Sequence, residues 1–174
     1  MEVSVTYGNL RKALFTLLVF CLVGMTLSNS SSAQSKKNSE EALAKRAEIV
    51  AVGKVISKKA QWEDNRSHIV TYVTLSVSEY LKGGAGGVVT IATPGGEVDG
   101  VGELYSHSAS FIPDEEVVVF AKKDKRGRFL VTGGPEGKLS VMRDKTTGKA
   151  MVSGKRSLDD FAADIRHAAT VNEN

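Results

Sequence analysis

The stretch "SHIVTYVTLSVSEYL", Ser67 to Leu81, shows the clearest structural pattern in the sequence. Apolar and polar side chains alternate along it, and a period of two is typical of a strand that buries one face. The face predicted to point inward holds Thr71, Val73, Leu75 and Val77, and the opposite face holds Tyr72, Thr74, Ser76 and Ser78. The stretch therefore predicts a half-buried β-strand.

Short β-rich runs separated by turn residues lie on both sides of this strand. They are "EIVAVGKVIS" (48–57), "VVTIAT" (88–93), "EVVVFAKK" (116–123), "RFLVTG" (128–133) and "KLSVMRD" (138–144). Gly53 interrupts the first run and indicates a bulge or a sharp bend. Asp124 and Gly127 suit a hairpin turn between the third and fourth runs. The spacing predicts a small all-β sandwich or barrel.

The C-terminal segment changes to a helical pattern. Ser157 is a suitable N-cap, and Asp159 and Asp160 follow in the first turn. One face of the predicted helix holds Leu158, Phe161, Ile165 and Ala168. A membrane or partner surface is an alternative interpretation, but we expect this apolar stripe to pack on the β-domain.

The first 33 residues have the features of a Sec-type signal peptide. Arg11 and Lys12 precede an uncharged, mostly apolar run, Ala13 to Leu27, and Ser31-Ser32-Ala33 forms a small-residue cleavage site. An uncleaved anchor is the alternative, but the run is shorter than the ~20 residues that a bilayer span needs. We expect a secreted or periplasmic protein, with a polar tail over 34–47, one domain over 48–174 and no stable membrane span after cleavage.

The amino-acid composition argues against several kinds of chemistry in the mature chain. The only cysteine, Cys21, lies in the predicted signal peptide, so the mature chain is expected to have no disulfide and no thiolate nucleophile or metal ligand. We predict no cofactor. The formal net charge of +3 over 174 residues is modest, which argues against a nucleic-acid partner.

The connection "TPGGEVDGVGELYSHSASFIPDEE", Thr93 to Glu116, is the main candidate site. It is rich in glycines and carboxylates, has no regular period, and is longer than most connections. The residues predicted to form a binding loop are Glu97, Val98, Asp99, Val101, Glu103, Leu104, Tyr105 and His107. Within it, "GELYSHSASF" could also be a strand of the barrel.

Three chemical alternatives use the same connection. Its glycines could cradle phosphate, although the Lys-Ser/Thr ending of a P-loop is missing. Glu97, Asp99 and Glu103 could bind calcium, although their spacing is not that of an EF-hand. Ser108, His107 and Asp114 could be written as a hydrolase triad, but no nucleophile-elbow motif is present. We therefore predict no metal ion and no catalytic residue.

Two further features suggest contact surfaces. Five basic residues gather around the predicted hairpin tip: Lys122, Lys123, Lys125, Arg126 and Arg128. They could bind an anionic envelope polymer or form an ordinary solvated tip. Trp62, the only tryptophan, could be an exposed anchor for a partner or a lid over the barrel end.

Several of these segments together resemble the netrin-like module, which is shared with the tissue inhibitors of metalloproteinases. The likeness covers about Glu48 to Gly134. The matching positions are Val50, Gly53 and Val55; Val77, Glu79, Lys82 and Gly83; Val89, Ile91 and Thr93; and Glu115, Glu116, Val119 and Phe120. The segment Pro94 to Gly102 is also similar to a "P-G-G-E-V-x-G-V-G" segment of exported bacterial proteins.

The resemblance implies a mainly β fold, a small OB-like five-stranded barrel with the amphipathic helix at its C-terminus. The inhibitors act through an N-terminal cysteine, which the mature chain lacks, so their inhibitory residue does not carry over. We expect a non-enzymatic binding module for an extracytoplasmic protein, such as a protease, or for an anionic envelope polymer. The alternative is a hydrolase or metal-dependent enzyme built on Thr93 to Glu116.

The expectation of export leads to a direct test. N-terminal sequencing of the protein recovered from the periplasm or medium should begin at or near Gln34. Recovery of the intact chain from the cytoplasm alone would contradict it.

Overall fold

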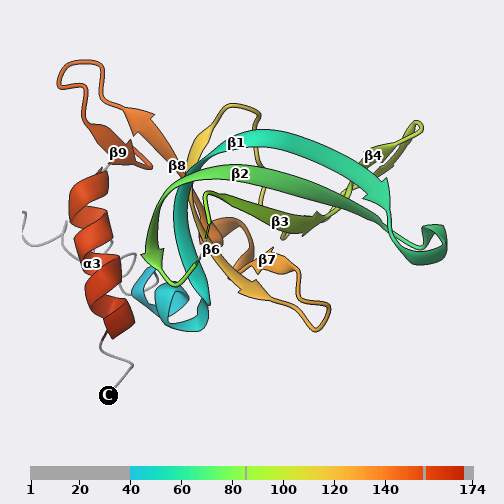
Figure 1. Ribbon diagram of the computed structural model, residues 1–174. Helices are drawn as coiled ribbons and strands as arrows, with labels where there is room; N and C mark the ends of the chain where they lie inside the picture. The colour runs from blue at the N-terminus through green and yellow to red at the C-terminus, as the bar shows by residue number, and fades with distance from the viewer. Residues whose placement is uncertain (1–39, 85, 155, 171–174) are drawn as a thin grey trace, which may run out of the picture. The chain divides into compact units, whose positions relative to one another are not determined.

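The computed structural model describes residues 40–84, 86–154 and 156–170, so the predicted signal peptide and residues 34–39 lie outside the described part (Figure 1). A short helix over 40–46 comes first. The strands are β1 (Ile49–Trp62), β2 (Ile69–Lys82), β3 (Val88–Pro94), β4 (Gly96–Val98), β5 (Val101–Glu103), β6 (Glu116–Lys123), β7 (Phe129–Val131), β8 (Lys138–Arg143), β9 (Ala150–Val152) and β10 (Arg156–Ser157). Two 3₁₀ turns, η1 (Asp64–Arg66) and η2 (Gly134–Gly137), and the C-terminal helix α3 (Leu158–Thr170) complete the fold.

Five of the strands form a closed ring in the order β1-β2-β3-β7-β6, and β6 pairs again with β1. The β3–β7 pair is parallel and the other pairs of the ring are antiparallel. One edge of β6 pairs with β1. Along its other edge, Glu116–Val119 pair with β8 and Ala121–Lys123 pair with β7. The chain therefore has the predicted mainly β fold, an OB-like five-stranded ring with a C-terminal helix.

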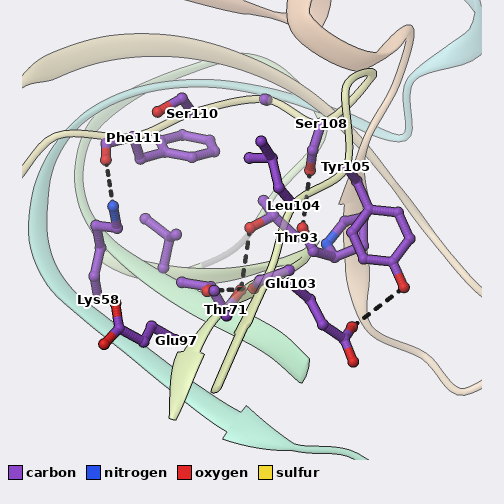
Figure 2. Close-up of a pocket in the computed structure, with 16 residues that line it drawn as sticks. Lys58, Thr71, Thr93, Glu97, Glu103, Leu104, Tyr105, Ser108, Ser110 and Phe111 are labelled. Carbon is purple, nitrogen blue, oxygen red and sulfur yellow. Dashed lines mark hydrogen bonds between the residues drawn. The ribbon is translucent and has the colours of Figure 1, made fainter. Parts of the chain in front are cut away.

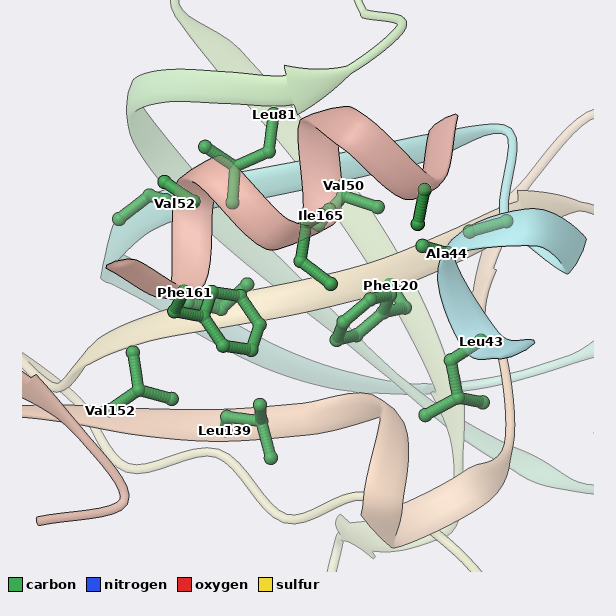
Figure 3. Close-up of a cluster of buried hydrophobic side chains, with 14 of the residues drawn as sticks. Leu43, Ala44, Val50, Val52, Leu81, Phe120, Leu139, Val152, Phe161 and Ile165 are labelled. Carbon is green, nitrogen blue, oxygen red and sulfur yellow. The ribbon is translucent and has the colours of Figure 1, made fainter. Parts of the chain in front are cut away.

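The start of β1, Ile49 to Val52, and the middle of β6, Val117 to Ala121, are buried on both faces, which explains why these two stretches are uninterrupted apolar runs. On one side of these strands, inside the ring, lies a cluster formed by Ile49, Ala51, Val55, Val73, Leu75, Val89, Ile91, Phe111, Val117, Val119 and Ala121. On the other side, Val50, Val52, Val118 and Phe120 pack against α3, β8, β9 and the first helix (Figure 3). The same two strands thus form one wall of each core.

The C-terminal helix packs as predicted. Phe161, Ile165 and Ala168 are buried, and the ring of Phe161 meets that of Phe120 edge to face, with centroids 6.3 Å apart. The Ser157 hydroxyl accepts a hydrogen bond from the backbone N–H of Asp160 at 3.1 Å, so Ser157 caps the helix. No helix in the described part of the chain is long and apolar enough to cross a membrane.

The segment expected to be a polar tail contributes to the core from residue 40 onward. Leu43, Ala44 and Ala47 are almost fully buried. The Lys82 ammonium donates hydrogen bonds to the carbonyl groups of Ala44 at 2.8 Å and Ala47 at 2.7 Å. These carbonyls at the helix end lack helical partners, so a cation there satisfies them and opposes the helix dipole. The compact unit therefore begins before Glu48.

β1 is longer than predicted and bends as it was expected to. Its pairing with β2 shifts register between Val52 and Gly53, where the sequence indicated a bulge. A Cβ at Gly53 would lie 2.6 Å from the carbonyl oxygen of Ser76, so the backbones approach too closely there for a side chain. β1 pairs with β6 only up to Lys54, and the remainder continues alongside β2, which pairs with β3 on its other edge.

The alternation in β2 leads to a stability prediction. Leu75 is fully buried inside the ring, whereas Ser76 is exposed. Leu75→Ala should lower the free energy of unfolding by about 2–5 kcal/mol because it leaves a cavity. Ser76→Ala, the control, should change it by less than about 0.5 kcal/mol. Chemical denaturation measures both changes. Equal losses of stability would contradict the assignment of Leu75 to the inward face of β2 and Ser76 to the outward face.

Candidate functional site

The connection from β3 to β6 lies at the end of the ring where β1 has left β6. It first forms the hairpin β4–β5, which pairs only with itself and lies away from α3 (Figure 1). Asp99 and Gly100 turn the hairpin with φ angles of 53° and 77°, the left-handed values of a tight two-residue turn. Within "GELYSHSASF" only Gly102 and Glu103 are in a strand, and that strand does not belong to the ring.

The start of the connection is held to the ring by close backbone contacts. The Gly95 N–H donates to the Ile69 carbonyl at 2.8 Å, and the Thr71 hydroxyl donates to the Gly95 carbonyl at 2.7 Å. Gly96 has φ 137°, and a Cβ there would lie 2.4 Å from the Thr71 hydroxyl oxygen. The glycines let the chain turn tightly over the ring.

Glu103 fixes the other strand of the hairpin. Its carboxylate accepts hydrogen bonds from the Ile69 N–H at 3.0 Å and from the Tyr105 hydroxyl at 3.3 Å. His68 lies beside this pair, with Nδ1 4.0 Å from the Glu103 carboxylate. Desolvation and then the adjacent carboxylate raise the pKa of Tyr105, so its hydroxyl remains a donor.

The second half of the connection returns to the core before β6. Phe111 is only 2% exposed inside the ring, and its carbonyl accepts a 2.6 Å hydrogen bond from the Lys58 ammonium. Glu115 accepts from Lys138 and from the Ser140 hydroxyl, both at 2.5 Å. Burial acts to raise the pKa of Glu115, but these donors and the Ile112 N–H outweigh it and lower the pKa. Both ends of the connection are therefore anchored.

Between these anchors lies an open cleft of about 600 Å³ (Figure 2). Its interior is formed by Val73, Phe111 and the buried hydroxyl-bearing Thr71 and Thr93. The Thr93 hydroxyl donates to the Thr71 carbonyl at 3.4 Å, and Thr71 itself is bonded to Gly95, so both hydroxyls have partners. The cleft thus offers mainly apolar contact over a satisfied polar floor.

The connection exposes a large share of the exposed apolar side chains. Of the seven large hydrophobic side chains exposed in the described part of the chain, four come from the connection: Val101, Leu104, Tyr105 and Ile112. Leu104 lines the cleft and is 97% exposed, and Tyr105 beside it is 41% exposed. Two adjoining exposed apolar side chains that line one cleft, Leu104 and Tyr105, are more typical of a contact surface than scattered exposed residues are.

The structure separates the predicted loop residues into two groups. Glu97, Glu103, Leu104 and Tyr105 line the cleft. The remaining four do not line it: Val98 and Val101 face each other in the hairpin, Asp99 pairs with Arg66 at 3.6 Å, and His107 bonds to the neighbouring Ser106. Sequence reasoning missed Lys58, Thr71 and Phe111 as parts of the cleft. The sequence offered one signal for these residues: Thr71 is a hydroxyl-bearing residue on the face of β2 that was predicted to point inward.

The hydrolase triad is not assembled. The Ser108 hydroxyl donates to the Pro94 carbonyl, the His107 ring bonds to Ser106, and Asp114 pairs with Lys54 at 2.8 Å. Across residues 40–84, 86–154 and 156–170, no three His, Cys, Asp or Glu side chains are grouped to hold a metal ion. Glu97, Asp99 and Glu103 thus do not form a calcium site in this structure.

Carboxylates partly neutralise the basic hairpin tip, and two of them, Glu63 and Asp64, come from a distant part of the chain. Arg126 pairs with Glu63 and Asp64, both at 2.8 Å. Arg128 pairs with Glu63 and, at 2.7 Å, with Asp124. The pairs with Glu63 and Asp64 join the β6–β7 hairpin to the turn after β1, next to the half-buried Trp62, whereas the Asp124 pair lies within the hairpin. Two of the five predicted cations thus have a structural role.

Comparison with models of known protein families finds no match, and comparison with curated proteins finds none either. The resemblance to the netrin-like module therefore rests on the residues given above, and a function has to be argued from the geometry of the cleft.

The anchoring of the connection can be tested by adding one methyl group. Gly96→Ala should lower the free energy of unfolding by about 1–3 kcal/mol, because an L side chain is strained at that φ and would strike Thr71. Gly102→Ala is the matched control in the paired strand, since its nearest neighbouring atom would be 4.0 Å away. Denaturation curves in which both variants lose the same stability would contradict this account.

Proposed function

We propose that this protein is an exported, non-enzymatic binding module of netrin-like type, which holds another protein at the cleft over the open end of its ring. The exposure of Leu104 carries the proposal. A leucine that is 97% exposed on the rim of an apolar cleft gives no packing to its own domain, so its contacts are available to a partner.

The anchoring of the cleft supports the same proposal. Residues on either side of the apolar rim are held by Thr71, Ile69 and Lys58 through hydrogen bonds of 2.6 to 3.0 Å. A surface already held in one conformation loses less entropy when a partner binds. Exposed tyrosine and leucine side chains on a rigid support are thus suited to act as binding anchors.

The alternatives find less support in the site. The separated Ser108, His107 and Asp114 do not favour a hydrolase. The pairing of Arg126 and Arg128 leaves fewer cations at the hairpin tip for an anionic envelope polymer. A protein partner, for which apolar rim contacts matter most, fits the geometry best.

The test compares partner capture by three forms of the protein. Leu104→Ala combined with Tyr105→Ala should weaken partner binding by at least about tenfold, as expected for interface anchors, and leave the thermal midpoint within about 2 °C. Val88→Ala combined with Met142→Ala removes two apolar side chains elsewhere that are also exposed, 56% and 54%, and serves as the control.

Capture from the envelope fraction or culture medium, followed by direct titration of the recovered protein, gives the first readout, and thermal unfolding the second. If the Leu104 and Tyr105 variant captures the partner as well as the control does, the cleft is not the site. A large fall in its midpoint would instead show that these side chains stabilise the fold.

A further inference from the structure

We infer that the cleft selects a partner segment in which an apolar side chain stands next to a lysine or arginine, and that Glu97 sets this preference. The inference rests on the proposed function, since it names the chemistry of the partner bound at the same cleft.

The charge of the lining is the first observation. Lys58, Glu97 and Glu103 are the charged side chains that line the cleft, so the lining carries a net negative charge when all three are ionised. A cationic group is therefore attracted to the cleft and an anionic group is disfavoured there. This separates a basic protein segment from an anionic polymer as the occupant.

The pairing of these charges is the second observation. Glu103 is occupied by the Ile69 N–H and the Tyr105 hydroxyl. The Lys58 ammonium is directed to the Phe111 carbonyl, where it holds the connection against β1. Glu97 alone among the three makes no hydrogen bond or ion pair with any residue that the structure describes. Its carboxylate is the charge that remains available for a ligand.

The position of Glu97 relative to the apolar surface is the third observation. It lies on β4 opposite Gly102, and Leu104 follows two residues after Gly102, just beyond the end of β5. Figure 2 shows Glu97 and Lys58 at one end of the cleft, with Leu104 and Tyr105 along it. An extended segment could place an apolar side chain against Leu104 and Phe111 and a cationic side chain beside Glu97. Glycine opposite Glu97 leaves that approach open.

The inference can be tested with peptides of known sequence. A displayed library of random heptapeptides is selected on the purified protein, and a synthetic copy of the most enriched peptide is titrated by fluorescence anisotropy. The enriched peptides are expected to hold an apolar residue next to lysine or arginine. A second synthetic peptide, in which that basic residue is replaced by glutamine, completes the ligand pair.

Glu97→Gln should weaken binding of the basic peptide about fivefold and leave the glutamine peptide unchanged, since a partly exposed ion pair has an effect of this size. Raising the salt concentration should reduce the affinity of the natural protein for the basic peptide toward that of the variant. Glu41→Gln removes the same charge from a residue that does not line the cleft and should change neither affinity.

The outcomes separate this inference from the proposed function. If both peptides bind the Glu97 variant as they bind the natural protein, while the Leu104 and Tyr105 variant loses both, the cleft is a binding site but Glu97 does not select a cation. If no selected peptide depends on Leu104 and Tyr105, or none is enriched at all, the proposed function and this inference both fail.

Discussion

The pairing of β1 with β6 is the contact on which the rest of the structure depends. It closes the ring, and it places two strands where apolar side chains are buried on both faces. Val117 and Val119 fill the ring while Val118 and Phe120 face α3, so one strand contributes to two cores. A polar residue at any of these positions would be desolvated without a partner, and the ring and the helix layer would be weakened together.

The candidate site follows from where that pairing ends. β1 pairs with β6 only as far as Lys54 but continues to Trp62, so the ring opens at this end. The connection from β3 to β6 has to cross the opening. It does so by inserting Phe111 into the ring, and by bonding Gly95 and Glu103 to the Ile69–Thr71 segment of β2. The cleft is the part of the opening that the connection does not fill, and Leu104 is left in water on its rim.

Charged groups have different roles in different parts of the molecule. Arg126 and Arg128 join two turns through Glu63, and Arg156 joins Glu40 of the first helix to Asp164 of α3, both at 2.7 Å. The pairs with Glu63 and Glu40 connect segments distant in sequence, and each partly exposed pair contributes modestly to stability. In the cleft, by contrast, Glu97 has no such partner within the described residues. A free carboxylate beside apolar surface can contribute to selectivity rather than to folding.

The sequence by itself determined the elements whose signals are local: the alternation in β2, the hairpin turn after β6, the Ser157 cap with the apolar stripe of α3, and the break at Gly53. Their periods and turn residues arise from interactions within a few positions of the chain, so they can be read without knowing the fold. The sequence also identified Thr93 to Glu116 as the segment of interest, and Leu104 and Tyr105 as its apolar contacts.

Only the tertiary structure decided which residues meet. It placed Lys58 and Thr71 beside the connection, brought Glu63 and Asp64 to the basic hairpin, and packed Leu43 and Ala44 of the expected tail into the core. It also separated Ser108, His107 and Asp114, which the sequence places within seven positions of one another. Such contacts depend on ring closure and strand register, and a local pattern carries no record of either because the partners come from distant parts of the chain.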